Sequence, residues 1–148
     1  MEFDYQINGG DFSSAGFASS HLKKILKQIN IDPKLIKKIV IALYEAEVNI
    51  VAHAYEGHIH VQIEPEQIRL EIKDRGPGIE DIDRAMEDGY STASEEVREM
   101  GFGAGMGLSN IKNNSDDLEI SSTVNEGTEL TIIKKINLAK FARNISSL

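Results

Sequence analysis

The sequence contains no cysteine and has fewer basic than acidic residues. Without cysteine it forms no disulfide, no thiolate zinc site and no cysteine nucleophile, which suits a reducing compartment such as the cytoplasm. Its 16 basic residues are outnumbered by 24 acidic ones, which gives a net charge of −8. We therefore expect no broad surface for nucleic acid or anionic lipid, although a local basic patch is compatible with this balance.

Long apolar runs are also absent. No stretch approaches the ~20 apolar residues of a membrane span, and the first four residues lack the basic and apolar regions of a signal peptide. A cytoplasmic protein without membrane or nucleic-acid contacts is the expectation. The 148 residues match one domain of ~150 residues. We expect this domain to span residues 1–136, followed by a tail, 137–148, that forms a short helix or frays.

Helical and strand-like periods alternate along the chain, which suits one mixed α/β layer structure. A first helix is expected from Ser13 or Ser14 to about Asn30. A longer one opens at Asp32-Pro33 and runs toward Ala54. Shorter helices are expected at 80–87 and 107–113, and strands at 3–7, 59–64, 68–73, 118–124 and 129–136.

The long helix carries two polar residues opposite its apolar stripe, which consists of Ile36, Ile39, Val40, Leu43, Ile50, Val51 and Ala54. Glu45 and Asn49 are four residues apart and therefore lie ~40° apart on one helix face. The amide oxygen of Asn49 suits a magnesium ion, and the carboxylate of Glu45 can accept a proton. Taken alone, the pair is more simply explained as a solvated helix face.

Two glycine-rich segments are candidates for ligand binding. Residues 74–78 (Asp-Arg-Gly-Pro-Gly) follow a strand, so they would place a carboxylate beside a site that a flat ligand such as adenine can approach. Glycines 101, 103, 105 and 107 precede a helix and could wrap phosphate. They match neither a Walker A loop nor a Rossmann loop. An ordinary turn and a flexible linker are the simpler explanations of the two segments taken singly.

The order and spacing of these segments resemble the GHKL ATPase superfamily. Glu45 and Asn49 resemble its N-box, residues 74–78 its first glycine box, residues 103–108 its second, and Gly127-Thr128 its last. Within the superfamily the chain resembles the anti-sigma-factor serine kinases and the stressosome switch kinases, two branches that the resemblance does not separate. The implied fold is an α/β two-layer sandwich, the Bergerat fold, whose mixed, largely antiparallel sheet has helices on one face.

The resemblance also implies residue roles, with ATP and Mg²⁺ as cofactors. Glu45 would be the general base, Asn49 would bind the metal, Asp74 would hold adenine and Thr128 would support Asp74. Arg98, in the polar lid, could reach the γ-phosphate as a cation, but a solvated charge is its simpler explanation. The expected ATP-binding residues are Asn49, Asp74, Gly76, Gly78, Ser91, Thr92, Gly103, Ala104, Gly105, Met106, Gly107, Leu108 and Thr128.

The function that the resemblance implies is a serine/threonine protein kinase. It would phosphorylate a small STAS-domain antagonist in sigma-factor or stress-response partner switching, with a sigma factor or a phosphatase as a further partner. A homodimer fits the anti-sigma branch, whereas switch kinases need not dimerise. The alternative is a non-catalytic ATP-binding module that sequesters a regulator.

One residue departs from the family pattern. Glu47 projects toward the apolar side of the long helix, where the family usually has a small or apolar side chain. Because an unpaired buried carboxylate is costly, we expect Glu47 at the edge of the stripe, in a salt bridge or at a subunit contact.

Overall fold

The computed structural model describes residues 1–87 and 107–138. Its five strands form one sheet with the order β1-β2-β3-β5-β4. They are β1 (Glu2–Asn8), β2 (Glu56–Ile63), β3 (Gln67–Arg75), β4 (Asp117–Thr123) and β5 (Gly127–Lys135). Each neighbouring pair is antiparallel, so the described strands contain no parallel pair of the kind that a mixed sheet would have.

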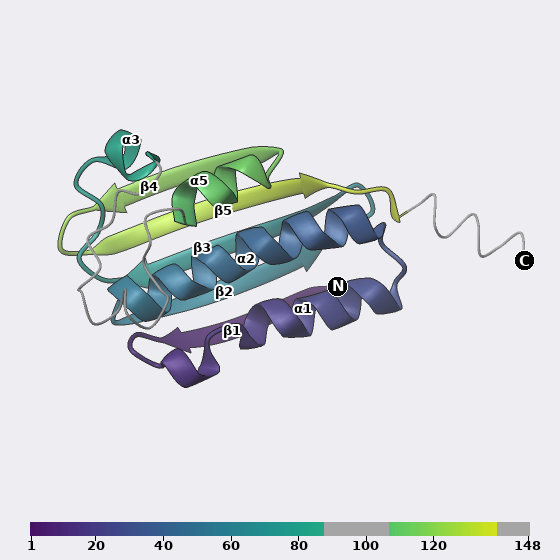
Figure 1. The fold of residues 1–148 in the computed structure, drawn as a ribbon, viewed down its shortest axis with the longest axis horizontal. Helices are drawn as coiled ribbons and strands as arrows, with labels where there is room; N and C mark the ends of the chain where they lie inside the picture. Colours follow the sequence, from purple (N-terminus) through teal and green to yellow (C-terminus); the bar gives the residue numbers. More distant parts are fainter. Residues whose placement is uncertain (88–106, 139–148) are drawn as a thin grey trace, which may run out of the picture.

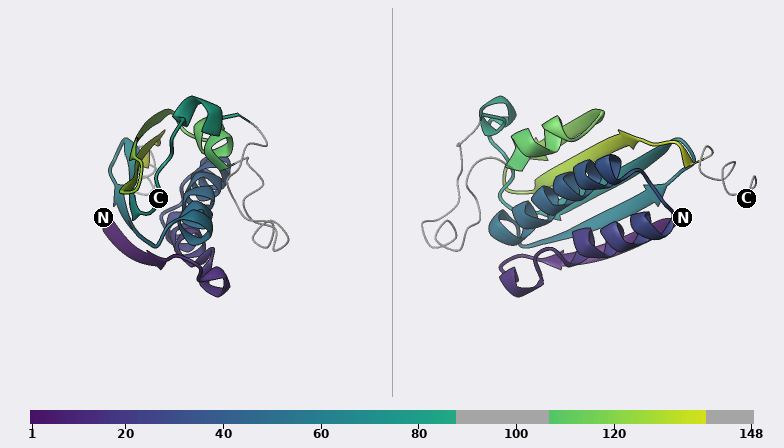
Figure 2. Two further views of the ribbon diagram at one scale, coloured as in Figure 1. Left: turned by 90° about the vertical axis from the view of Figure 1, so that its left-hand side faces the viewer. Right: turned by 45° about the vertical axis from the view of Figure 1, so that its right-hand side comes forward.

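Three helices cover one face of the sheet, and no helix of the described residues covers the opposite face, which we call the open face (Figures 1 and 2). They are α1 (Phe17–Gln28), α2 (Pro33–His53) and α5 (Gly107–Asn113). A 3-10 turn, η1 (Phe12–Ser14), precedes α1, and a short helix, α3 (Ile82–Ala85), follows β3. The two-layer α/β architecture with helices on one face is thus confirmed.

The start of α2 follows from its sequence. The Asp32 side chain accepts a hydrogen bond of 2.9 Å from the Lys34 amide, and Pro33 occupies the first helical position. The expected start of α1 at Ser13 or Ser14 was wrong. Both serines lie before Gly16, whose φ of 97° interrupts the helical path, so that α1 begins only at Phe17.

The hydrophobic core lies between the helices and the sheet. The apolar stripe of α2 packs there as its spacing predicted, with Val40 and Ala54 half-buried at its margins. Of the side chains on α2, those of Ile39, Leu43 and Ile50 are almost completely buried. On the strands, the large apolar side chains that are almost completely buried are Ile59, Val61, Ile68, Leu70 and Ile132. Because the core fixes the apolar side of α2, the polar side chains on its opposite side have a defined position.

Within residues 1–87 and 107–138, no helix has both the length and the apolar character needed to cross a bilayer.

Candidate functional site

Glu45 lies on the half-buried outer side of α2 and contacts α5. The side-chain Nδ2 of Asn110 donates a hydrogen bond of 3.1 Å to Glu45 Oε1. Asn110 was not among the predicted site residues. The 65 positions between the two residues hide the contact from any local pattern, and only the packing of α5 on α2 reveals it. The bond fixes the carboxylate and leaves its second oxygen with no bond to the described residues.

Asn49 lies one turn further along α2 and faces the start of α5. A Cβ placed on Gly107 would lie 3.0 Å from Asn49 Oδ1 and 3.3 Å from its Nδ2. A glycine at this position therefore lets the first turn of α5 approach the carboxamide. The described residues of α5 are Gly107–Asn113, the range expected for a helix there. Leu108, expected at the nucleotide, places its side chain in the hydrophobic core, which leaves its backbone for that role.

Asp74, at the end of β3, is half-buried and faces the start of β5. Its Oδ1 accepts a 3.1 Å hydrogen bond from the Thr128 amide. Burial raises the pKa of Asp74, and the bond from Thr128 opposes this shift. A Cβ on Gly76 would lie 3.5 Å from Asp74 Oδ1 and 3.0 Å from the Cα of Ala54, the residue that caps α2. The Asp74 segment therefore adjoins the same end of α2 that carries Asn49.

Two further glycines permit close backbone approaches around Asp74. Gly127 has a φ of 151°, and a Cβ there would lie only 2.0 Å from the Asp74 carbonyl oxygen. Gly78 has a φ of 75°, and its Cβ would lie 2.4 Å from the carbonyl oxygen of Thr123. The segments 74–78 and 123–128 consequently pack backbone against backbone, and a side chain at either glycine would separate them.

Ser122 on β4 joins these two segments, and sequence reasoning missed it. Its hydroxyl accepts a 2.7 Å hydrogen bond from the Ile79 amide and lies 2.8 Å from Thr128 Oγ1. Its place in an alternating, half-exposed strand gave no signal of this role. The Ser122 hydroxyl therefore connects Ile79 to Thr128, the residue whose amide binds Asp74.

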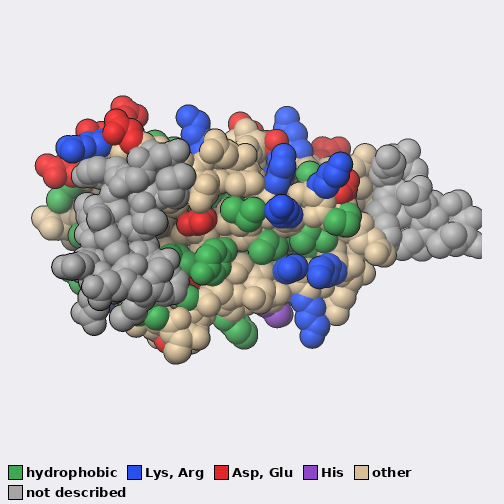
Figure 3. Space-filling model, in the orientation of Figure 1, with side chains coloured by type: hydrophobic (Ala, Val, Ile, Leu, Met, Phe, Trp, Pro, Cys, Tyr) green, Lys and Arg blue, Asp and Glu red, His purple; other side chains and the backbone are tan. Residues whose placement is uncertain are grey.

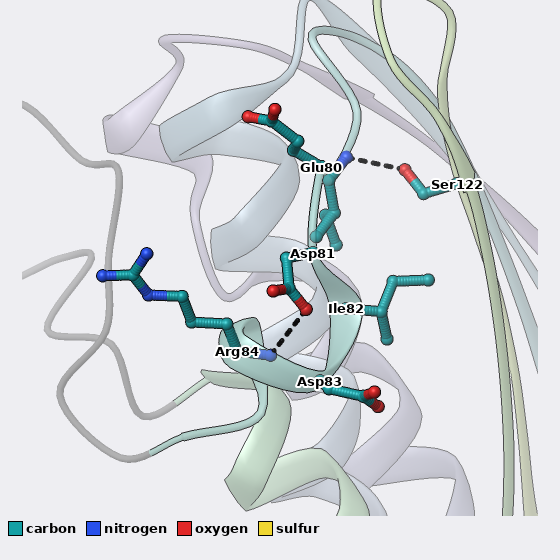
Figure 4. Close-up of a pocket in the computed structure, with 7 residues that line it drawn as sticks. Glu80, Asp81, Ile82, Asp83, Arg84 and Ser122 are labelled. Carbon is teal, nitrogen blue, oxygen red and sulfur yellow. Dashed lines mark hydrogen bonds between the residues drawn. The ribbon is translucent and has the colours of Figure 1, made fainter.

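A cavity of about 590 Å³ opens beside this network (Figure 4). Figure 4 shows Arg84 and Asp83 extending to opposite sides of α3. The cavity borders the network through Ser122, but neither Asp74 nor Asn49 lines it. Because three carboxylates contribute to its lining, we do not assign it to a triphosphate. The lining residues are Ile79, Glu80, Asp81, Ile82, Asp83, Arg84 and Ser122.

Glu47 has a different environment from each of those expected for it. Its side chain is fully buried, and it accepts hydrogen bonds from the backbone amides of Gly16, Ala18 and Ser19, at 2.9, 3.1 and 3.2 Å. These amides form the start of α1, where unpaired N–H groups and the helix dipole favour a negative charge. Glu47 therefore connects α2 to the start of α1 inside the core, and its side chain does not lie beside that of Glu45.

Several predicted residues lie outside the described part of the chain. These are Ser91, Thr92, Arg98, Gly103, Ala104, Gly105 and Met106.

The described residues bring together three kinds of group at one end of α2. A carboxylate and a carboxamide lie one turn apart on α2, α5 contacts both through Asn110 and Gly107, and the half-buried carboxylate of Asp74 lies near the end of α2. The amide oxygen of Asn49 is a hard ligand of the kind that Mg²⁺ takes, and Gly107 packs closely against the same carboxamide. Asn49 alone therefore fits a magnesium ion only if phosphate oxygens and water supply the other ligands. The described residues contain no cluster of three His, Asp or Glu side chains that could hold a metal. Two of the groups, Glu45 and Asp74, can exchange or accept protons.

Comparisons with known proteins identify relatives of this chain. The chain is 36% identical over 117 residues to the "Anti-sigma F factor" of Thermoanaerobacter sp. (strain X514), covering 74% of this chain and 78% of that protein. It is 30% identical over 116 residues to the "Serine/threonine-protein kinase RsbT" of Bacillus subtilis (strain 168), covering 76% and 81%.

Solved structures share the fold. One contains the RsbU and RsbW domains of a Mycobacterium tuberculosis protein, with a TM-score of 0.60 and 18% identity over 90% of this chain and 32% of that one. Another is the mycobacterial sensor histidine kinase MprB, with a TM-score of 0.52 and 16% identity over 93% and 99%. The family model of the histidine kinase-like ATPase domain matches residues 14–134. The chain thus belongs to the histidine kinase-like ATPase domain family.

Proposed function

We propose that this chain is a cytoplasmic, Mg-ATP-dependent serine/threonine protein kinase. Its substrate is a small STAS-domain antagonist, and it acts in sigma-factor or stress-response partner switching. The observation that carries the proposal is the placement of Glu45 and Asn49 on one face of α2, with α5 against both and the Asp74 segment at the helix end. The names of the two relatives, an anti-sigma factor and a serine/threonine kinase, support it.

In this proposal, Asp74 and the glycines beside it recognise the nucleotide. The carboxylate of Asp74 accepts a hydrogen bond from the adenine amino group, while the Thr128 amide holds its other oxygen. Gly76 and Gly78 leave space for the base. Asn49 provides the amide ligand for magnesium, which when bound neutralises charge on the phosphate oxygens. The glycines of the second box wrap the phosphates.

In this proposal, Glu45 acts in the phosphoryl-transfer step. The hydroxyl of the acceptor protein approaches the free carboxylate oxygen of Glu45 while Asn110 holds the other oxygen. As the acceptor oxygen bonds to the γ-phosphorus, the bond to the β,γ-bridging oxygen breaks, and Glu45 takes the hydroxyl proton. ADP and a phosphorylated serine or threonine are the products. Positioning and charge stabilisation supply most of the rate in such a reaction.

The alternative is a non-catalytic module that binds ATP and sequesters a regulator. The anti-sigma name of one relative favours it, since that name describes an action on a sigma factor and no transfer reaction. The two functions differ in whether Glu45 is needed for more than binding.

The test is incubation with γ-labelled ATP, Mg²⁺ and each STAS-domain protein encoded in the same genome. We expect label on one of these proteins. Glu45→Gln should abolish the label with ATP affinity retained, and Asn49→Ala should abolish both. A matched control is Lys112→Gln, which changes an exposed residue of α5 and should leave transfer intact. Tight binding of a STAS protein without label would establish the non-catalytic module instead.

A further inference from the structure

Lysines are concentrated at one end of the helical layer. Between Phe17 and Tyr44 the sequence places six of its 16 basic residues but only one of its 24 acidic residues, Asp32. Because α1 and α2 form an antiparallel pair (Figure 1), these lysines meet at the end where the two helices are joined. We call this set the lysine patch, and its members are Lys23, Lys24, Lys27, Lys34, Lys37 and Lys38.

The lysine patch is exposed and is not neutralised by its surroundings. Figure 3 shows it as blue side chains over α1 and the first half of α2, whereas acidic side chains gather around α3. All six lysines are exposed, and none forms an ion pair with another described residue. The one nearby acid, Asp32, already accepts a hydrogen bond at the start of α2.

The stability of the helices does not account for the whole patch. Lys27 lies in the last turn of α1, where a cation stabilises the helix dipole. Lys34, in contrast, lies in the first turn of α2, which contains no acidic residue. A cation is unfavourable there. A lysine kept at an unfavourable position, in a chain of net charge −8, indicates a role outside the folding of α2.

The patch is aligned with the Glu45 site. Lys38 precedes Glu45 by seven residues, or about two turns, and Lys34 precedes it by eleven, or about three turns. At ~100° per residue, all three lie within ~40° of one another around the axis of α2, and Lys38 is ~10 Å from Glu45 along it. A protein that rests on the patch can therefore extend along α2 to the carboxylate.

We infer that the lysine patch is the docking surface for an acidic face of the phosphoacceptor protein. The identity of this partner as a STAS-domain protein rests on the proposed function. The distribution of charge favours an acidic protein as the partner that binds the lysine patch. Outside Phe17–Tyr44 the chain carries 23 of its acidic residues. A long nucleic acid or a flat anionic membrane would meet this negative charge, whereas a compact protein can place a few carboxylates on the patch alone.

The experiment measures the affinity of the full chain for each STAS-domain protein of the same genome. The patch variant is Lys27→Gln/Lys34→Gln/Lys38→Gln. The matched control removes three charges from the open face of the sheet and is Arg69→Gln/Lys73→Gln/Lys135→Gln. We expect the patch variant to bind about tenfold more weakly, since each exposed ion pair contributes modestly. The control should stay within about twofold of the wild type.

Further measurements separate docking from structure and from catalysis. ATP affinity should be the same in all three proteins. The Tm of the patch variant should stay close to that of the wild type, because loss of the favourable charge at Lys27 offsets loss of the unfavourable charge at Lys34. Patch-dependent binding without label transfer would leave docking intact and refute the kinase function.

Three results would overturn the inference. One is equal binding by the patch variant and the wild type. Another is the failure of every STAS protein to bind the wild type. The third is tighter, patch-dependent binding of a short DNA duplex or of phosphatidylserine-containing vesicles, which serve as the competing probes.

Discussion

Replacing Glu47 by glutamine tests whether a buried carboxylate joins the first two helices. In the wild type, Oε2 accepts hydrogen bonds from the amides of Gly16 and Ala18, and Oε1 accepts one from Ser19. Glutamine keeps one acceptor oxygen and turns an NH₂ group toward the third amide, so that one buried donor loses its acceptor. That loss costs about 1–3 kcal/mol, and the two remaining bonds lose their charge assistance.

The expected total is a loss of about 2–4 kcal/mol of unfolding free energy, a large part of the ~5–15 kcal/mol of a typical domain. In urea unfolding the midpoint should fall by roughly 1–2 M with little change in slope. Glu45→Gln is the matched control, because it makes the same chemical change two residues away at a half-exposed position. It should cost no more than about 1 kcal/mol. Equal stability of the two variants would refute the role assigned to Glu47.

Three further changes test the site. Asp74→Asn should raise the unfolding free energy at pH 7, because burial raises the pKa of Asp74 and penalises its ionised form. The gain should fade as the pH falls through this raised pKa and vanish below the ordinary one, which urea unfolding across pH would detect. Gly127→Ala should lower the unfolding free energy by about 2–4 kcal/mol, because the added Cβ would lie 2.0 Å from the Asp74 carbonyl oxygen and the φ of residue 127 is positive. Gly10→Ala should lower it by only about 1–2 kcal/mol, because φ is 78° there but no atom lies within 4 Å. Equal thermal shifts of the two variants would count against the packing argument. Asn110→Ala should lower kcat about tenfold with unchanged ATP affinity, because Glu45 loses its orientation; an unaltered kcat would exclude that positioning role.

Local signals in the sequence were sufficient for much of the fold. Asp32 and Pro33 specify the start of α2 through a side-chain cap and a fixed φ, and the structure begins the helix there. The turn at 125–127 likewise specifies the β4–β5 hairpin, in which Asn125 adopts a φ of 66°. These features depend on residues close together in the chain, so a pattern of adjacent residues predicts them.

The contacts that complete the site depend on residues far apart in the chain. Asn110 and Glu45 are 65 positions apart, and Ile79 and Ser122 are 43 positions apart. An asparagine on a short helix and a serine on an alternating strand have many ordinary roles, so neither residue type indicates a partner. The order of the strands has the same origin, because β5 pairs with β3 and thereby separates β3 from β4.

Glu45 and Glu47 show how one helix serves both structure and chemistry. Two residues along an α-helix rotate a side chain by ~200°, so the same carboxylate is directed to nearly opposite sides of α2. The buried one is satisfied by three amides at the start of α1, while the half-exposed one accepts one bond from Asn110. Its second oxygen, which accepts no bond from the described residues, is the one proposed to meet the reacting hydroxyl. A carboxylate saturated by fixed donors is poorly placed to accept a proton, whereas one that is only oriented remains able to do so. The rotation about α2 therefore separates the residue that holds the helices together from the residue proposed to act on the substrate.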